Sequence, residues 1–147
     1  MLNKQSVSIT LKTPKFGWLP VEIITSDFNL SFEASDLGLN VIDQLTDMVI
    51  SISNNQASKC YFYLEPSAYL ISLSSFPDKA ILQISFLEDF DDNENHISEK
   101  VYECEINPSE FRASIITALQ DFLSFDYSID DWPEPEKKEL LNNLTIS

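Results

Sequence analysis

Glycine is scarce in this chain: Gly17 and Gly38 are the only two among its 147 residues. A P-loop or a dinucleotide-binding turn needs several closely spaced glycines, so the common nucleotide-dependent enzymes are excluded. Long hydrophobic runs are also missing, because no stretch approaches the ~20 apolar residues of a membrane-spanning helix. The N-terminal segment MLNKQSVSITLK has no apolar signal core. We therefore expect a cytoplasmic location and no contact with membranes.

Histidine and cysteine, which serve often as catalytic groups and metal ligands, are nearly absent. His96 is the sole histidine and lies among acidic residues, which favour its charged form over a neutral base. Cys60 and Cys104 project from expected strands onto apolar faces, where a thiol is usually inert and, in the cytoplasm, reduced. No Ser-x-Gly nucleophile turn exists. We therefore expect no catalytic residues and no enzyme activity.

The acidic run after the central strands resembles a calcium-binding EF-hand loop only in part. Asp89, Asp91 and Asn93 fit the first, third and fifth positions of such a loop. The sixth position carries Glu94 instead of the required glycine. Paired carboxylates are too common in this chain to single out two for hydrolysis. The sequence therefore predicts no metal site and no cofactor.

Basic residues are few: nine Lys and Arg stand against 24 Asp and Glu, for a net charge of −15. Residues 1–80 carry five basic and eight acidic side chains, a net of −3, whereas residues 81–147 carry four and sixteen, a net of −12. Such a field repels nucleic-acid phosphates and anionic lipids and attracts a basic partner. We expect a basic protein partner and no nucleic acid. The alternative is that the acidic surface serves only solubility.

The first third of the chain alternates apolar and polar residues with a period of two, which predicts β-strands. Pro20 lacks a backbone N–H, so we expect the strand that contains it to begin late or to lie at a sheet edge. The expected strands cover residues 5–12, 18–25 and 28–33. The second and third could instead form one long bent strand.

Two helices are expected from apolar residues at helical spacing and from their start signals. Asn40 is suited to cap the first helix, and Asp43, three residues on, is placed to bond back to the cap. This helix should end near Asn54. The second helix begins at Asn107-Pro108-Ser109-Glu110, which combines a capping residue, a first-turn proline and a glutamate, and it should reach about Phe125.

The longest strand-forming region, Cys60 to Phe90, lies between these helices. Its three apolar runs are separated by turns at Glu65-Pro66 and Phe76-Pro77 and predict an antiparallel meander. The third run is apolar on both faces, as is typical of a central strand. A further strand should cover residues 97–106. A short helix from Pro135 to about Asn143 closes the chain.

Strands and helices are grouped rather than strictly alternating, which favours an α+β fold over a parallel α/β fold. We expect a single globular domain over residues 1–147. It should contain an antiparallel β-sheet of about six or seven strands, with a meander, packed against two main α-helices and a short C-terminal helix.

Aromatic residues supply a second candidate site, because exposed Tyr and Trp are favoured at interfaces and in ligand pockets. Five of them qualify by position: Trp18, Tyr61, Tyr63, Tyr127 and Trp132. Their alternative role is to pack the far face of the sheet. Trp132 stands amid carboxylates, which is unusual for a solvated loop, so it either contacts a partner or anchors the tail to the domain.

The order of the elements and two short motifs resemble a known class of protein. The meander contains an L-E-P-x-x-Y corner (Leu64, Glu65, Pro66, Tyr69), and the tail contains a W-P pair (Trp132, Pro133). The layout from Trp18 to Leu144 resembles the small acidic immunity proteins of bacterial polymorphic or contact-dependent toxin systems, and similar uncharacterised bacterial families. The resemblance implies a noncatalytic protein that binds and blocks a cognate toxin, often a basic nuclease.

We therefore expect an interaction protein of the immunity type that binds a basic partner through an acidic surface. The acidic positions follow from charge and not from the resemblance. The candidate partner-binding residues are Glu88, Asp89, Asp91, Asp92, Glu94, Asp130, Asp131, Trp132 and Glu134. The alternative function is that of a cytoplasmic domain that binds a small ligand in an aromatic-lined pocket.

Overall fold

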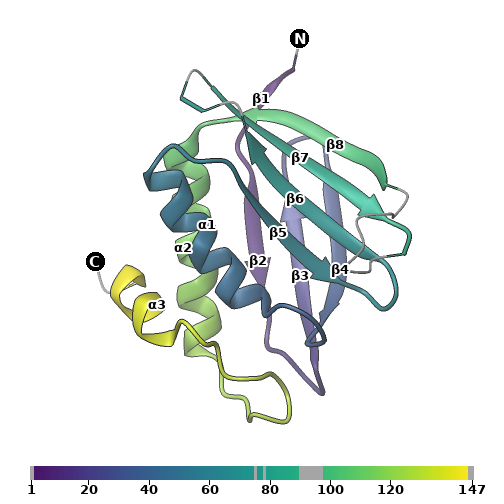
Figure 1. The fold of residues 1–147 in the computed structure, drawn as a ribbon, viewed down its shortest axis with the longest axis vertical. Helices are drawn as coiled ribbons and strands as arrows, with labels where there is room; N and C mark the ends of the chain where they lie inside the picture. Colours follow the sequence, from purple (N-terminus) through teal and green to yellow (C-terminus); the bar gives the residue numbers. More distant parts are fainter. Residues whose placement is uncertain (1, 75, 78, 90–97, 146–147) are drawn as a thin grey trace.

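The computed structural model describes residues 2–74, 76–77, 79–89 and 98–145. This part of the chain contains eight strands and three helices (Figure 1). In chain order they are β1 (Lys4–Gln5), β2 (Ser8–Leu11), β3 (Trp18–Ile24), β4 (Asn29–Ser35), α1 (Val41–Ser53), β5 (Ser58–Tyr63), β6 (Ala68–Ser74), β7 (Ala80–Leu87), β8 (Ser98–Ile106), α2 (Pro108–Ser124) and α3 (Lys138–Thr145). No helix within these described ranges is long and apolar enough to cross a membrane.

The strands form two sheets where the sequence suggested one. The larger sheet has the order β1-β8-β7-β6-β5, and the smaller sheet has the order β2-β3-β4. Every pairing between these strands is antiparallel except that of β1 with β8. The expected α+β class is confirmed, together with the antiparallel meander, the two main helices and the short third helix. β7 lies inside the larger sheet, as its two apolar faces predict.

The first expected strand is divided between the two sheets. β1 pairs in parallel with β8, whereas β2 pairs antiparallel with β3. The chain passes from one sheet to the other at Val7, whose side chain is buried. Side chains alternate between faces in both halves, so the sequence pattern continues across the point at which the hydrogen-bonding partner changes.

Pro20 lies in β3, the middle strand of the smaller sheet, so the expectation of a late start or an edge position is wrong. β3 begins at Trp18 and pairs with β2 and β4. The carbonyl of Pro20 accepts a hydrogen bond from the Lys12 N–H (3.1 Å), one residue beyond the end of β2. In an antiparallel strand the N–H and carbonyl of one residue face the same neighbour. The N–H that Pro20 lacks would therefore face Lys12, just beyond the end of β2, so no hydrogen bond is lost within β2.

The inner faces of the two sheets pack together through aromatic side chains. Phe32 of β4 contacts Phe62 of β5 (5.2 Å between ring centroids) and Tyr69 of β6 (4.9 Å). Phe28, just before β4, stacks on Tyr102 of β8 at 4.3 Å. Burying one such side chain contributes roughly 1.5–3 kcal/mol. α1 packs against β5 and α2 against β2, so the two helices lie side by side along the sheets (Figure 1).

β3 and β4 are separate strands of a hairpin rather than one bent strand. The Thr25 N–H donates to the Phe28 carbonyl (2.8 Å) across the turn between them. Elsewhere, Cys60 and Cys104 are buried free thiols, as expected. Burial raises the pKa of both thiols, so both stay protonated and unreactive near neutral pH.

Both main helices begin at their predicted capping residues. The Asn40 side chain accepts a hydrogen bond from the Ile42 N–H (2.9 Å), and the Asn107 side chain accepts one from the Glu110 N–H (3.1 Å). Asp43 does not bond back to the cap as its position suggested. Its carboxylate accepts hydrogen bonds from two backbone N–H groups in the C-terminal part of the chain. The residue that local pattern assigns to the helix start is therefore used for a long-range contact.

Candidate functional site

Residues 125–137, between α2 and α3, form a segment that we call the tail loop. Trp132 at its centre is 0% exposed. The indole N–H of Trp132 donates to the Asn40 side-chain oxygen (3.2 Å), and the Asn40 side-chain amide donates to the Pro133 carbonyl (3.3 Å). Trp132 was expected either to contact a partner or to anchor the tail, and in the structure it anchors the tail loop to the domain. Because the side chain is buried and its N–H is engaged within the protein, we do not keep Trp132 among the candidate partner-binding residues.

Asp131 also holds the tail loop in place. Its carboxylate accepts hydrogen bonds from the Phe16 N–H (3.1 Å) and the Ser128 N–H (3.2 Å), and its backbone carbonyl accepts one from the Gly17 N–H (2.8 Å). The hydrogen bond from Phe16 is the main reason that the pKa of Asp131 lies below its ordinary value. Asp131 thus ties the tail loop to the turn between β2 and β3, whereas the neighbouring Asp130 is exposed.

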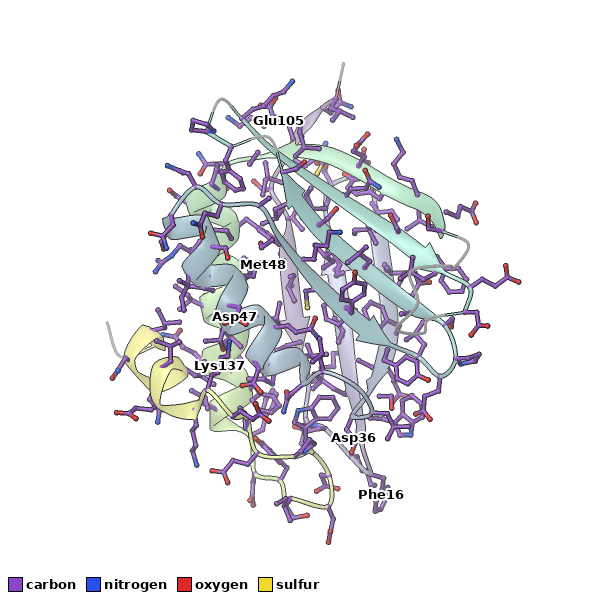
Figure 2. The ribbon with its side chains drawn as sticks, viewed as in Figure 1. Phe16, Asp36, Asp47, Met48, Glu105 and Lys137 are labelled. Carbon is purple, nitrogen blue, oxygen red and sulfur yellow. The ribbon has the colours of Figure 1, made fainter. Side chains whose placement is uncertain are left out.

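Two acids of α1, Asp43 and Asp47, fasten the end of the tail loop. The Asp43 carboxylate accepts hydrogen bonds from the backbone N–H groups of Glu136 (3.0 Å) and Lys137 (2.9 Å). Asp47 forms an ion pair with the Lys137 ammonium, and Figure 2 shows these two side chains together beside α1. The tail loop is therefore held at its centre by Trp132 and at its end by α1.

The tail loop and α1 border a groove with a volume of about 440 Å³, which we call the acidic groove. Its lining includes five carboxylates and one ammonium, so its charge is strongly negative. These charged residues are Asp36 before α1, Asp43 and Asp47 of α1, and Glu134, Glu136 and Lys137 of the tail loop. Within the described ranges, no group of three or more His, Cys, Asp or Glu residues could hold a metal ion.

The other predicted acids lie elsewhere. Glu88 and Asp89 are exposed directly after β7. In Figure 1 β7 ends on the right of the view, whereas the tail loop and α3 lie at the lower left. Asp91, Asp92 and Glu94 fall outside the described residues. Of the predicted residues that the structure describes, only Glu134 lines the acidic groove.

Sequence reasoning missed Asp36, Asp43, Asp47 and Glu136 as members of one surface. A partial signal existed, because Asp43 and Asp47 are four residues apart and so share one face of the predicted helix. What the pattern did not contain was the position of the tail loop, which brings Glu136 to that helix face.

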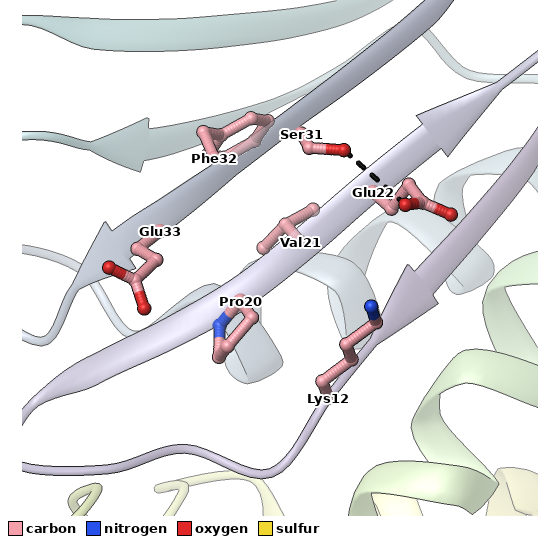
Figure 3. A pocket seen from close by; sticks show the side chains of 7 residues that line it. All are labelled: Lys12, Pro20, Val21, Glu22, Ser31, Phe32 and Glu33. Atoms are coloured by element: carbon pink, nitrogen blue, oxygen red, sulfur yellow. Dashed lines mark hydrogen bonds between the residues drawn. The ribbon is translucent and has the colours of Figure 1, made fainter.

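Two further concave surfaces differ in chemistry from the acidic groove. Figure 3 shows a pocket of about 260 Å³ on the outer face of the smaller sheet. Its charges are mixed, since Lys12 faces it together with Glu22 and Glu33, and the Ser31 hydroxyl donates to Glu22 (3.3 Å). Its lining therefore has no single charge that would select a cation or an anion.

The second is a mainly apolar pocket of about 330 Å³ beside the tail loop, with Leu123, Phe125 and Ile129 in its lining and the charged pair Glu134 and Lys138 at its polar side. Tyr127 and Trp132 also line it. The other three aromatic residues of the predicted ligand site lie on strands: Trp18 on β3 and Tyr61 and Tyr63 on β5. The predicted aromatic set is therefore distributed over separate elements.

Together, the fold and the groove define an acidic α+β protein with a preformed concave surface. No family model matches its sequence, and no curated protein matches it. Among solved structures, the chain is similar to a chain of the CdiA-CT/CdiI toxin and immunity complex from Enterobacter cloacae, with a TM-score of 0.44 and 13% sequence identity. The match covers 80% of this chain and 100% of that one. This similarity is a weak one, like the resemblance seen in the sequence; at this TM-score and identity it shows no family and assigns no role to any residue.

Proposed function

We propose that this chain is a noncatalytic interaction protein of the immunity type, and that its acidic groove receives basic side chains of a protein partner such as a toxin. The observation that carries this proposal is the convergence of five carboxylates from three segments on one concave surface. Concave sites lined by one sign of charge focus the electric field and speed the arrival of the opposite charge. The net charge of −15 acts in the same direction.

The groove is formed before a partner arrives. Trp132 and Asp43 hold the tail loop against α1, so binding does not have to order that loop. A preordered surface loses less conformational entropy on association than a mobile one. Asp43 and Asp47 are engaged with the tail loop, which leaves Asp36, Glu134 and Glu136 as the acids that we expect to meet the partner.

Glu134 is paired with Lys138 at 2.9 Å, but both side chains are largely exposed. An exposed ion pair of this kind contributes only about 0–1 kcal/mol. A partner's arginine can therefore replace Lys138 at little cost and add a bidentate hydrogen bond to the carboxylate.

The test is to neutralise the three available acids with Asp36→Asn, Glu134→Gln and Glu136→Gln in one variant. The probe is a synthetic peptide rich in lysine and arginine that also carries leucine and tryptophan. Stopped-flow fluorescence measures its association rate at several salt concentrations. We expect association at low salt to slow by roughly tenfold and its salt dependence to flatten, because charges steer encounter more than they set affinity.

The matched control removes the same charge after β7 and at the start of β8, with Glu88→Gln, Asp89→Asn and Glu99→Gln. Equal slowing in both variants would show that only net charge matters. Greater slowing in the control would place the site in the acid run that the sequence suggested. A native association rate in the groove variant would refute the proposal.

A further inference from the structure

Large apolar side chains are exposed on three loops at the end of the molecule that carries the acidic groove. We call these residues the apolar tip: Phe16 (74% exposed) between β2 and β3, Leu37 (53%) and Leu39 (69%) between β4 and α1, and Ile129 (75%) in the tail loop. Single exposed apolar residues are ordinary, but several gathered beside a charged groove mark an interaction surface.

Backbone hydrogen bonds join the three loops of the apolar tip. The Gly17 N–H donates to the Asp131 carbonyl and the Asp36 N–H donates to the Gly17 carbonyl, both at 2.8 Å. Figure 2 shows Phe16 and Asp36 at the same end of the molecule. Leu39 and Asp36 also line the acidic groove. The apolar tip and the groove are therefore neighbouring parts of one surface, since Leu39 belongs to both and Asp36 links the groove to the turn that carries Phe16.

Phe16 occupies a backbone position that does not suit it. Lys15 and Trp18 exchange backbone hydrogen bonds (2.9 and 3.0 Å) around a two-residue turn, in which Phe16 has a φ of 53° and Gly17 a φ of 84°. Two positive φ angles are the pattern of a type I′ turn, which strongly favours Asn, Asp or Gly at the first central position. A bulky residue there is a genuine outlier. Such strain is concentrated at functional sites.

Burial does not explain this choice of residue, because Phe16 is 74% exposed. The Phe16 ring is contacted by the Lys15 ammonium, which lies 5.4 Å from the ring centroid. An exposed cation–π contact of this kind contributes about 0.5–1 kcal/mol. A strained backbone position therefore holds an aromatic ring exposed to solvent, near a groove of strong negative charge.

We infer that the apolar tip is the energetic centre of the partner-binding surface, and that it takes a segment of the basic partner in which large apolar side chains are flanked by lysine or arginine. This inference rests on the proposed function of the acidic groove. The flanking charges follow from the five carboxylates beside Leu39. Aromatic and aliphatic anchors near the middle of an interface carry most of its binding energy, whereas the surrounding charges set the encounter rate. A second copy of this chain is disfavoured as the occupant, because each copy carries a charge of −15.

The decisive variant is Phe16→Asn. Asparagine is among the preferred residues at this turn position, so the variant should fold at least as stably as the native chain. Dissociation of the basic peptide that carries leucine and tryptophan should nevertheless become roughly tenfold faster, with little change in the association rate or its salt dependence. Adding Leu39→Ser and Ile129→Ser should accelerate dissociation further.

Two controls separate this effect from general surface changes. Val101→Thr alters an exposed apolar residue of β8 (38% exposed) that lies on another element, and it should leave dissociation unchanged. A second peptide with the same lysines and arginines, but serine in place of leucine and tryptophan, should bind more weakly to the native chain and should not respond to Phe16→Asn. Dissociation that is equally fast from native chain and Phe16→Asn would overturn the inference.

The two proposals fail in different ways. If the native chain binds the two basic peptides equally and the groove variant slows both, the acidic groove stands and the apolar tip does not. If the native chain binds neither peptide, the proposed function fails and the inference fails with it. Sedimentation of the free chain addresses self-association, since a dimer that Phe16→Asn dissociates would make the apolar tip a contact between copies and overturn the inference.

Discussion

Replacing Trp132 tests the anchoring of the tail loop, on which the shape of the acidic groove depends. The indole is 0% exposed and its N–H donates to the Asn40 side chain at 3.2 Å. Trp132→Ala removes both the packing and the hydrogen bond. Trp132→Phe keeps a buried aromatic ring and removes the N–H. Comparing the two variants therefore separates the contribution of packing from that of the hydrogen bond.

The expected magnitudes follow from these contacts. A buried aromatic residue changed to alanine typically costs 3–5 kcal/mol of stability, so Trp132→Ala should fall near about 3–5 kcal/mol. The hydrogen bond should contribute about 0.5–1.5 kcal/mol. Its loss leaves no orphaned acceptor, because the Asn40 oxygen still accepts the Ile42 N–H. Trp132→Phe should therefore cost distinctly less than Trp132→Ala.

A double-mutant cycle isolates the bond between Trp132 and Asn40. Asn40→Ser keeps a good helix cap but has too short a side chain to reach the indole. The cycle of Trp132→Phe with Asn40→Ser should give a coupling free energy of about 0.5–1.5 kcal/mol. A coupling near zero would mean that the indole N–H does not bond to the cap of α1.

Urea unfolding followed by far-ultraviolet circular dichroism measures these free energies. Limited digestion with trypsin adds a local measurement, because Lys137 is the last residue of the tail loop and Lys138 the first of α3. Cleavage at these lysines should be faster in Trp132→Ala. If Trp132→Ala lowers the free energy of unfolding by less than about 1 kcal/mol and leaves cleavage unchanged, the anchoring role is refuted. Removal of a buried aromatic side chain that anchors a loop should destabilise the protein by more than that.

Two further predictions concern the turn between β2 and β3. Gly17→Ala should destabilise the chain more than Gly38→Ala, by up to about 1 kcal/mol. Both glycines have positive φ, but a Cβ at Gly17 would lie 2.9 Å from an Asp36 carboxylate oxygen, which would have to turn away, whereas nothing lies within 4 Å at Gly38. Equal losses of stability in urea unfolding would contradict this close approach. Because hydrogen bonds from Phe16 and Ser128 lower the pKa of Asp131 in the folded chain, its stabilising effect should be present above the unfolded pKa of about 4 and lost as pH falls through the lower folded pKa. Urea unfolding across this acidic range should therefore show a smaller loss of stability for Asp131→Asn than for the native chain, and identical pH profiles would argue against these bonds.

Local signals in the sequence predict most of the secondary structure correctly. Asn40 and Asn107 cap the helices that they were expected to cap, because a side-chain oxygen one residue before a helix satisfies its first N–H groups whatever the rest of the fold does. The meander of β5, β6 and β7 follows from apolar runs separated by short turns. The boundaries of α3 are less accurate, since this helix begins at Lys138 instead of Pro135.

The candidate site was predicted less well, and its residues show why. The tail acids were proposed to meet a partner as a group, yet the Asp131 carboxylate accepts hydrogen bonds from backbone N–H groups of the protein itself and Trp132 is buried. Phe16 and Leu39 were not proposed at all. A large apolar residue is usually expected to be buried, and the sequence does not show that these two are exposed. Exposure depends on three loops that are distant in the sequence.

Residue spacing and composition were enough to predict the helices, most of the strands, the α+β class and the excess of negative charge. Three features became visible only in the folded chain: the division of the first strand between two sheets, the hold of Asp43 on the tail loop, and the meeting of acids from three segments in one groove. The physical reason is that periodicity specifies which face of an element is apolar, whereas the partner of each face is chosen by packing and hydrogen bonding over long sequence separations.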